Sequence, residues 1–515
     1  MTKKIALLFV NDFADLGAER FYLLSGESIW EATAQEVVAQ EHEIVCHDYW
    51  LIAPLLFKKT NSLPKSIVDV EEFRIATSGN REDREGREKR DVFSMLLKSG
   101  YLSEEIIGRY RNIAFKNAAI DMQILTLVGM ALILLSVDVE EKAKSANEWE
   151  RYLTLECPVS DYLIRSSAKG VAIDTEALRR HKKDIEHQYY MALKDFSAKY
   201  DMPLEVPTDD DVVEYLSPRG FDFSGVGIEY ILNFVPTPDG FSEKLLDLRK
   251  IAASRMVLNA IPISQKRIFP IVDSFGSVTS RIYYKDPSLQ NISKRHRNII
   301  CADDGMKLSY VDYGQFEAGI MGVLSRDGSM LELFSSGDLY STVSEKIFLD
   351  TSKRKAAKRL FLSYAYGMKR KSLIDAAVEF GAQREAAKNF FNQFSRFEKW
   401  KMEVWEEFRS KGRIGTSFGN FLSRVGFDDL SEKEKRSAVS QVVQGTASLI
   451  FKKALIKLSH LPHVQLKIPM HDAVLFQHSD SFDPQDVAHL FAGVMTEHFG
   501  GEIGGKASVA NFFVD

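Results

Sequence analysis

The stretch KLSYVDYGQFE, residues 307–317, determines how the rest of the chain is interpreted. Residues 308–312 have the alternation of a β-strand, and the chain reaches Asp312 at the end of that strand. After Gly314 the period changes, because Phe316 begins a run of apolar residues at helical spacing. A carboxylate is therefore expected where a core strand ends and a helix begins. An isolated Asp there would often be only a helix cap, but a buried charge needs a partner.

A second carboxylate lies in a predicted hairpin near the C-terminus. Alternating apolar residues in 464–470 and the apolar run 473–476 predict two strands joined by a tight turn at His471-Asp472. Asp is a common turn residue, so turn chemistry alone is one explanation. If Asp472 and Asp312 converge, they supply the shared oxygen ligands that two hard divalent cations about 4 Å apart require.

Length and composition set limits on both fold and function. At 515 residues the chain is too long for one core, and two to four domains are expected. The three cysteines, Cys46, Cys157 and Cys301, are far apart, which favours a reducing cytoplasm over a disulfide framework or a structural zinc site. The net charge is −5, so any nucleic-acid site must be a local basic surface. The N-terminus has no full signal peptide.

Residues 1–150 are interpreted as a small α/β domain. Strands are expected at 5–10 and 43–46, and a long apolar helix at 120–137. Polar residues near the start of that helix favour a buried core helix over a membrane span, so no membrane association is expected. The densely charged stretch 78–91 is expected to be a solvated loop or helix end.

The rest of the chain has an α+β pattern. Long helices are expected at 175–200, where Asp174 is placed to cap the helix, and at 241–261, with an irregular segment at 203–238 between them. Helices dominate 341–410. The strand signals lie far apart in the sequence, around the two carboxylates, so distant strands must meet in one sheet.

Residues 353–371, KRKAAKRLFLSYAYGMKRK, favour a basic helix that stops at Gly367. Its face at spacings of four carries two cations, an apolar residue and a tyrosine: Arg354, Lys358, Leu362 and Tyr366. Nucleotide binding requires cations for a polyphosphate and a platform for a base. The alternative is a solvated basic helix, although its unbroken positive charge would be self-repelling without an anion.

Together these stretches resemble the family A DNA polymerases, which include bacterial DNA polymerase I and many phage replicases. The resemblance covers roughly residues 150–515. Residues 312–319 resemble DYSQIELR, the basic helix resembles R-x3-K-x7-YG, and residues 471–473 resemble HDE. Two more stretches agree with the family in the right order: 279–281 with 286–292, which resemble TGR…DPNLQNIP, and 443–447, which resemble PIQGTA. Five motifs in order are specific.

The resemblance implies the right-hand fold of these polymerases. The thumb is expected at 151–265, the palm at 266–335 and 431–515, and the fingers at 336–430. An N-terminal α/β domain like a 3′–5′ exonuclease would precede the thumb.

The resemblance also implies roles for individual residues. Asp312 and Asp472, with the Tyr313 carbonyl, would hold two Mg²⁺ ions for phosphoryl transfer to a primer 3′-hydroxyl. Lys358 would also be a catalytic proton donor to pyrophosphate. Glu317 would exclude a ribose 2′-hydroxyl. The nucleotide-binding residues would be Arg354, Lys358, Leu362, Tyr366, Glu317 and Gln315. The DNA-binding residues would be Arg281, Gln290, Asn291, Arg436, Gln444 and His471.

Four positions depart from the family pattern. Leu362 replaces an aromatic residue, Ala473 replaces a glutamate, Ser293 replaces a proline and Ser440 replaces an asparagine. None of these changes removes a leading metal ligand, so a template-directed DNA polymerase that uses deoxynucleotides and primer–template DNA is still predicted.

The N-terminal domain resembles an exonuclease that has lost its catalytic residues. Residues 44–48 resemble the second exonuclease motif, but Ile52 stands where its aspartate belongs. The stretch Asn11–Ala14 contains no D-x-E, and of the family's carboxylates only Asp121 is a candidate. Two-metal hydrolysis needs several convergent carboxylates. We therefore expect an inactive domain, kept for structure or for a replication partner protein.

Two alternatives remain open. A single-subunit RNA polymerase would share the palm and the basic helix, but Glu317 and Gln315 argue against it. A degenerate, inactive DNA-binding scaffold would not need both Asp312 and Asp472. The expected location is the cytoplasm of a bacterium or of a phage-infected host cell.

Overall fold

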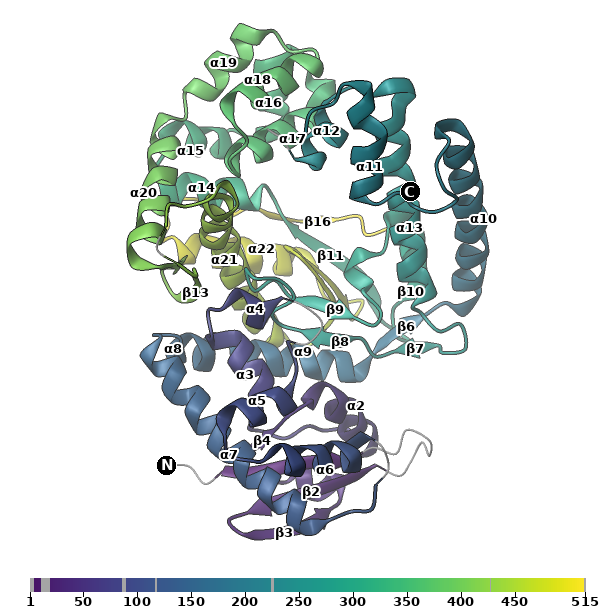
Figure 1. The fold of residues 1–515 in the computed structure, drawn as a ribbon, viewed down its shortest axis with the longest axis vertical. Helices are drawn as coiled ribbons and strands as arrows, with labels where there is room; N and C mark the ends of the chain where they lie inside the picture. The colour runs from purple at the N-terminus through teal and green to yellow at the C-terminus, as the bar shows by residue number, and fades with distance from the viewer. Residues whose placement is uncertain are drawn as a thin grey trace.

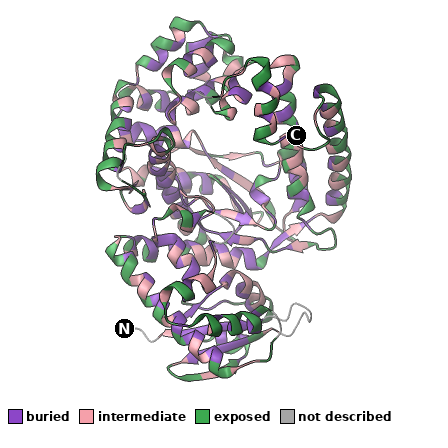
Figure 2. Ribbon diagram, viewed as in Figure 1, coloured by how far each residue is buried: buried purple, intermediate pink, exposed green. Residues whose placement is uncertain are grey.

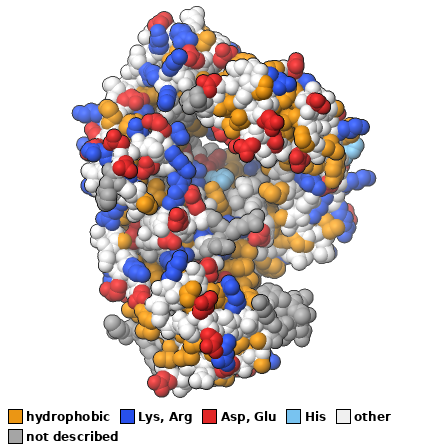
Figure 3. All heavy atoms as spheres, in the orientation of Figure 1, with side chains coloured by type: hydrophobic (Ala, Val, Ile, Leu, Met, Phe, Trp, Pro, Cys, Tyr) orange, Lys and Arg blue, Asp and Glu red, His pale blue; other side chains and the backbone are white. Residues whose placement is uncertain are grey.

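The chain folds into an N-terminal lobe and a larger lobe (Figure 1). The space-filling view shows a hollow in the centre of the larger lobe (Figure 3). The computed structural model describes residues 4–10, 19–85, 89–115, 118–223, 227–426 and 428–513. The expected α+β class is confirmed, with long helices around a small number of sheets. The stretch Asn11–Ala14, where a first exonuclease motif was sought, lies outside the described residues.

The N-terminal lobe is built on a five-stranded sheet in the order β3-β2-β1-β4-β5. Its strands are β1 Lys4–Val10, β2 Arg20–Ser25, β3 Ser28–Ala32, β4 Glu43–Cys46 and β5 Ile67–Asp69. Its helices are α1 Ala34–Val38, α2 Tyr49–Thr60, α3 Val70–Thr77, α4 Arg81–Arg84, α5 Val92–Ser99, α6 Glu104–Phe115 and α7 Met122–Ser145. β1 pairs in parallel with β4 and antiparallel with β2. A mixed sheet with helices around it agrees with the α/β domain predicted for residues 1–150.

Helix α7 is the apolar helix expected at 120–137, and it extends eight residues further. In the described part of the chain it is the one helix long and apolar enough to cross a membrane, and half of its most apolar window is buried inside the protein. It packs so closely on the sheet that a Cβ on Gly129 would lie 2.7 Å from the Leu24 side chain. This packing is that of a core helix.

The charged stretch 78–91 is not the solvated segment that its composition predicted. Arg84 in α4 is 1% exposed and donates to the backbone oxygen of Val278 and to Oδ1 of Asn420. Lys89 is also buried and lies 2.6 Å from the carboxylate of Asp273. The prediction failed because these charges find partners far away in the sequence, so the stretch forms the junction between the two lobes.

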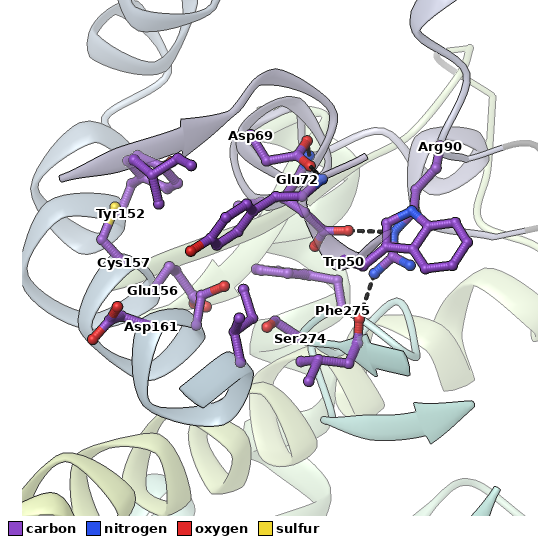
Figure 4. Close-up of a pocket in the computed structure, with 16 residues that line it drawn as sticks. Trp50, Asp69, Glu72, Arg90, Tyr152, Glu156, Cys157, Asp161, Ser274 and Phe275 are labelled. Atoms are coloured by element: carbon purple, nitrogen blue, oxygen red, sulfur yellow. Dashed lines mark hydrogen bonds and ion pairs between the residues drawn. The ribbon is translucent and has the colours of Figure 1, made fainter. Parts of the chain in front are cut away.

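A small cavity of about 70 Å³ lies at the same junction (Figure 4). Figure 4 shows Arg90 and Trp50 on one side of it and Ser274 and Phe275, from the larger lobe, on another. The guanidinium of Arg90 pairs with Glu72 and donates to the backbone oxygen of Val272. This volume holds only a few water molecules, each of which needs about 10–15 Å³.

The larger lobe is organised around a four-stranded antiparallel sheet in the order β14-β15-β11-β16. The strands are β11 Lys307–Tyr313, β14 Val464–Met470, β15 Ala473–His478 and β16 Ala507–Ala510. Three helices pack with this sheet: α14 Phe316–Ser325, α21 Glu432–Ser459 and α22 Gln485–His498. Figure 2 shows that most of this region is buried. The strands around the two carboxylates are thus neighbours, as expected.

Helices α8 Trp149–Arg151, η1 Tyr152–Glu156 and α9 Cys157–Lys169 connect the lobes. Beyond them α10 Thr175–Tyr200 packs against α13 Phe241–Asn259, with the carboxylate of Asp174 capping α10 as predicted. The segment 203–238 was expected to be irregular, but it contains α11 Asp209–Leu216, η2 Ser217–Arg219 and α12 Ile228–Phe234. Several of its turn-forming residues cap these helices: Thr208 and Asp211 form a capping box at α11, Gly220 ends η2, and Gly227 precedes α12.

The helices on the other side of the hollow cover the range predicted as fingers (Figure 1). They are α15 Gly328–Ser335, α16 Leu339–Phe348, η6 Thr351–Lys353, α17 Arg354–Ala365, α18 Arg370–Glu379, α19 Arg384–Asn392 and α20 Ser395–Lys411. Short strands complete the lobe: β6 Val171–Ile173, β7 Arg267–Ile268, β8 Ile271–Asp273, β9 Tyr283–Lys285, β10 Ile300–Cys301, β12 Arg413–Thr416 and β13 Gly419–Ser423. The remaining short helices are η3 Pro238–Gly240, η4 Leu289–Asn291 and η5 Lys294–Ile299.

Candidate active site

Asp312 and Asp472 meet at one end of the central sheet. Asp312 is the penultimate residue of β11 and lies opposite Ala473 in β15. Asp472 lies in the two-residue turn between β14 and β15, where His471 adopts a left-handed φ of 60°. The backbone N–H of Tyr313 donates to the backbone oxygen of Asp472 at 3.3 Å. A strand end and a hairpin turn therefore place the two acids side by side, as the sequence predicted.

The two carboxylates are electrostatically crowded. Burial, and then the neighbouring Asp472 carboxylate, raise the pKa of Asp312 to about 7. Burial also raises the pKa of Asp472. Three cations, Lys358, Lys294 and Arg297, favour the ionised form of Asp312 from farther away. Within the described ranges no side chain forms an ion pair with either acid.

This donor set fits a hard divalent cation. Two half-buried carboxylates that make no ion pair within the described ranges, beside a strand-end carbonyl, are the oxygen ligands that Mg²⁺ and similar ions prefer. A cation between them would also relieve the repulsion that raises the pKa of Asp312.

Helix α17 contributes Lys358, whose positive charge lowers the pKa of both carboxylates. The ammonium of Lys358 lies 5.4 Å from the ring centre of Tyr340 in α16. Arg354 stacks on the same ring at 5.5 Å and makes a bidentate ion pair with Asp338, at 2.7 and 2.8 Å. That pairing lowers the pKa of Asp338 to about 2. The amide of Gln315 also donates to Asp338, at 3.3 Å.

Sequence reasoning missed Asp338 and Tyr340, which hold the two cations in place. Asp338 carries a detectable signal, because an Asp three residues before a Ser is a common helix start, and it caps α16 by accepting from Ser341 N–H. Tyr340 carries no signal of this kind, since its role depends on a contact between two helices.

Glu317 lies at the centre of a second cluster. Its carboxylate accepts a hydrogen bond from the Tyr366 hydroxyl at 2.5 Å and from the Arg281 guanidinium at 2.6 Å. Burial and the Glu317 carboxylate together raise the pKa of Tyr366, while a hydrogen bond with Gln444 opposes them. Four predicted site residues from distant parts of the chain are thereby brought together.

The other predicted site residues differ in how far they are exposed. His471 packs edge-on against Tyr283 at 5.7 Å, and burial and Arg281 lower its pKa. Asn291 and Arg436 are exposed, whereas Leu362 is half-buried against the core. Gln290 lies in the interior, where its side-chain oxygen accepts from the backbone N–H of Tyr284. Gln290 is therefore not brought to the surface where the others meet.

The N-terminal lobe contains a separate cluster of acids around β4. Side-chain donor atoms of His47, Asp48 and Glu71 lie within 4.8 Å of one another. However, Asp48 accepts from the ring of His47 at 2.9 Å, and Glu71 accepts from the backbone N–H of Asp48. Burial and the neighbouring acids raise the pKa of Glu71 to about 8. Asp69 is occupied as the cap of α3.

Asp121, the expected remnant of the third exonuclease motif, is also engaged elsewhere. It caps α7 through the N–H groups of Gln123 and Ile124 and pairs with Arg109 at 2.6 Å. It is not part of the cluster formed by His47, Asp48 and Glu71.

A palm-like sheet with two convergent carboxylates, faced by a basic helix across a hollow, is the architecture of a right-hand nucleic-acid polymerase. Comparison with known proteins narrows this class. The sequence pattern that describes DNA polymerase family A matches residues 234–503, just over half of the chain. The chain belongs to DNA polymerase family A.

The curated relatives are bacterial enzymes named DNA polymerase I. The Helicobacter pylori enzyme is 22% identical over 475 residues, which are 87% of this chain and 52% of the relative. The thermostable enzyme of Thermus aquaticus is 24% identical over 345 residues, which are 60% of this chain and 41% of the relative. The chain thus spans about half the length of the curated relatives it matches.

One solved structure is similar over nearly the whole chain. The POL domain of Pol1 from M. smegmatis, in complex with DNA primer-template and dNTP, superimposes with a TM-score of 0.73. The alignment covers 98% of this chain and 94% of that one, at 18% identity. At this identity the similarity establishes the fold, including the N-terminal lobe.

Proposed function

We propose that this chain is a template-directed DNA polymerase that adds deoxynucleotides to the 3′-hydroxyl of a primer. The observation that carries the proposal is the convergence of Asp312 and Asp472, which have no ion-pair partner within the described ranges, with Lys358 facing them. Membership of family A and the bacterial relatives support the same reaction. The thumb, palm and fingers are assigned to the ranges 151–265, 266–335 with 431–515, and 336–430.

Two Mg²⁺ ions held by Asp312, Asp472 and the Tyr313 carbonyl would supply charge neutralisation at the primer oxygen and the triphosphate. Lys358 and Arg354 bind the phosphates, and Lys358 is the group placed to give a proton to the leaving pyrophosphate. Asp338 engages Nε and one terminal nitrogen of Arg354, so a phosphate that is to bind the same two nitrogens must replace this bidentate ion pair.

Glu317 and Tyr366 form the wall that selects the sugar. The carboxylate is fixed by both Arg281 and Tyr366, so it cannot move aside for a ribose 2′-hydroxyl without losing a hydrogen bond. Arg281, His471, Gln444, Asn291 and Arg436 contact the primer–template. Gln290 acts indirectly, through the loop that it fastens to Tyr284.

The N-terminal lobe is proposed to lack proofreading activity. Its clustered acids accept internal hydrogen bonds from the His47 ring and from backbone N–H groups, which supports this proposal. Its role is structural, with docking of a replication partner protein as a second possible use of its exposed surface.

Primer extension tests these assignments directly. A 5′-labelled primer annealed to a template is incubated with Mg²⁺ and dNTPs, beside a lane without nucleotides and a lane with ribonucleotides only. We expect extension with dNTPs and an unshortened primer in the lane without nucleotides. Efficient extension with ribonucleotides would identify an RNA polymerase instead. Shortening that persists in Asp472→Ala would assign a nuclease activity to the N-terminal lobe.

Absence of extension in every lane, with retention of primer–template on the protein, would indicate the inactive DNA-binding scaffold. The Asp312→Ala variant serves as the control, because it removes the proposed chemistry and keeps the rest of the DNA surface.

A further inference from the structure

The tip of the thumb touches the fingers across the central hollow. Helix α12 of the thumb lies against α17 and α18 of the fingers (Figure 1). The guanidinium of Arg359 in α17 donates to the backbone oxygen of Asn233 at 3.0 Å. The hydroxyl of Tyr230 donates to the backbone oxygen of Ser372 in α18 at 3.2 Å.

Apolar contacts reinforce these two hydrogen bonds. The ring of Phe234 lies 5.8 Å from the ring of Phe380, centre to centre. Arg359 stacks on both rings, at 5.9 and 6.0 Å. Phe234 is only 8% exposed, although it is the last residue of a short helix at the tip of an arm. Its burial therefore depends on the fingers.

Helix α12 joins two hydrophobic cores. Ile231 and Leu232 belong to the core of the thumb tip, together with α11 and α13. Phe234, two residues further along, belongs to the large core that continues through the palm and fingers. One seven-residue helix thus connects the free end of the thumb to the fingers, and the thumb, palm and fingers form a closed ring.

The space under this contact leads to the proposed DNA surface. A cavity of about 800 Å³ is lined by Tyr230, Phe234 and Arg359 from the contact. It is also lined by Tyr366 and Arg436, two residues assigned to the nucleotide and the DNA. The space-filling view shows the hollow that opens in the centre of this face (Figure 3). The contact therefore covers the place where a template would lie.

Resting on the proposed function, we infer that α12 and the α17–α18 corner form a latch that closes around primer–template DNA and holds the enzyme on it during successive additions. The contact is suited to repeated opening. It consists of two hydrogen bonds to backbone oxygens, each of modest net strength, one aromatic pair, and the stacking of Arg359 on both rings of that pair. It has no interlocking charge pair among the described residues that would make it permanent.

The inference is tested by closing the latch covalently. Cysteines are introduced as Phe234→Cys and Phe380→Cys and are bridged with a short bismaleimide, after Cys157→Ser and Cys301→Ser. Cys46 is fully buried and stays. The double-cysteine protein is first assembled on primed circular single-stranded DNA, or on the same DNA linearised away from the primer, and only then is it bridged. It is then washed in about 1 M salt, where the Debye length falls to about 3 Å and charge contacts to phosphate are lost.

We expect the bridged protein to remain on the circle and to slide off the linear DNA. Protein bridged before DNA is added should not load onto the circle. Equal release from circular and linear DNA after bridging would overturn the latch. This readout does not require DNA synthesis. A protein that stays on the circle but does not extend primers would refute the polymerase assignment and support the latch. A protein that extends primers but is released from both DNAs would support the polymerase assignment and refute the latch.

A second pair of variants does not depend on the cysteine protein folding. Arg359→Gln and Tyr230→Phe each remove one latch hydrogen bond. We expect each to shorten the product made per binding event by about fivefold, the change that corresponds to one hydrogen bond of average strength, with the rate of single-nucleotide addition unchanged. Lys355→Gln is the matched control, because it removes the same charge from an exposed position of α17. Product lengths equal to those of the control would also overturn the inference.

Discussion

Two clusters of partly or fully buried acids in this chain differ in what their oxygen atoms contact. In the palm, Asp312 and Asp472 have no ion-pair partner within the described residues, and their repulsion raises the pKa of Asp312 to about 7. In the N-terminal lobe, Asp48, Asp69 and Glu71 accept hydrogen bonds from nearby backbone or ring N–H groups. From this comparison we expect a cluster of carboxylates to bind a metal only where few of its oxygen atoms are already engaged, as proposed for Asp312 and Asp472. Acids lie close together in both clusters, so closeness does not distinguish them.

The largest expected effect comes from removing one palm acid. Asp312→Asn should slow single-turnover nucleotide addition by about 1,000-fold, because metal ligation contributes several kcal/mol and each 1.4 kcal/mol is tenfold in rate. Asp48→Asn, the matched change in the other cluster, should leave the rate unchanged. If both variants were equally impaired, the distinction between the clusters would fail.

The second-largest expected effect comes from neutralising a buried acid that is paired with cations. Glu156, at the junction, contacts Arg151 and lies 2.7 Å from Lys452, and all three are buried. Glu156→Gln should lower the free energy of unfolding by about 3 kcal/mol, because it leaves the buried Lys452 without a counter-charge, whereas Arg151 keeps its ion pair with Glu148. Urea denaturation measures this change.

The control for that prediction is Glu497→Gln, which breaks the exposed pair of Glu497 with Lys457 at 2.6 Å. An exposed pair contributes less than about 1 kcal/mol. Equal losses in the two variants would show that burial at the junction does not strengthen the pairing.

A pH series examines the N-terminal cluster. The pKa of Glu71 rises from 4.5 to about 8 on folding, so the folded state holds the proton more tightly than the unfolded state. The stabilising contribution is complete below pH 4.5 and is lost as the pH rises toward 8. The free energy of unfolding should fall by at most about 1.4 kcal/mol per pH unit in this window.

Glu71→Gln should flatten this dependence, whereas Glu41→Gln at an exposed position should not. Denaturation curves between pH 5 and pH 8 make the comparison. An unchanged slope in Glu71→Gln would indicate that Glu71 is ionised, and hence able to bind a metal.

The smallest expected effect concerns Glu317, a palm acid whose oxygens are engaged. Tyr366→Phe removes one of its two hydrogen bonds and leaves the bond from Arg281. Discrimination against ribonucleotides should weaken by about fivefold, or about 1 kcal/mol. Competition between dNTP and the matching ribonucleotide measures it. Unaltered discrimination would mean that Arg281 alone fixes Glu317.

Local sequence patterns were enough to predict the strands and the helix around the two carboxylates Asp312 and Asp472. The alternation at 308–312, the hairpin around Asp472 and the basic helix that begins at Arg354 were all predicted, because each depends on neighbours in sequence. The segments 78–91 and 203–238 were predicted wrongly. Their charges and turn residues are satisfied by distant partners or by helix caps, which composition does not reveal.

Prediction from the sequence had the same limit at the candidate active site. Asp338 and Tyr340 escaped prediction because their relation to Arg354 and Lys358 arises where two helices pack. Gln290 was assigned to DNA from its place in a motif, but its side chain fastens a loop. A motif identifies the position, and only the packing determines which way the side chain faces.

The buried charges at the junction constrain how this protein could become shorter. Lys89 supplies one of the two cations that neutralise Asp273, which is fully buried in the palm, and Arg84 holds the hairpin residue Asn420. A gene that lost the first 150 codons would therefore encode a palm with an undercompensated acid and an unfastened hairpin. An N-terminal lobe without nuclease activity would be retained by natural selection on these contacts alone.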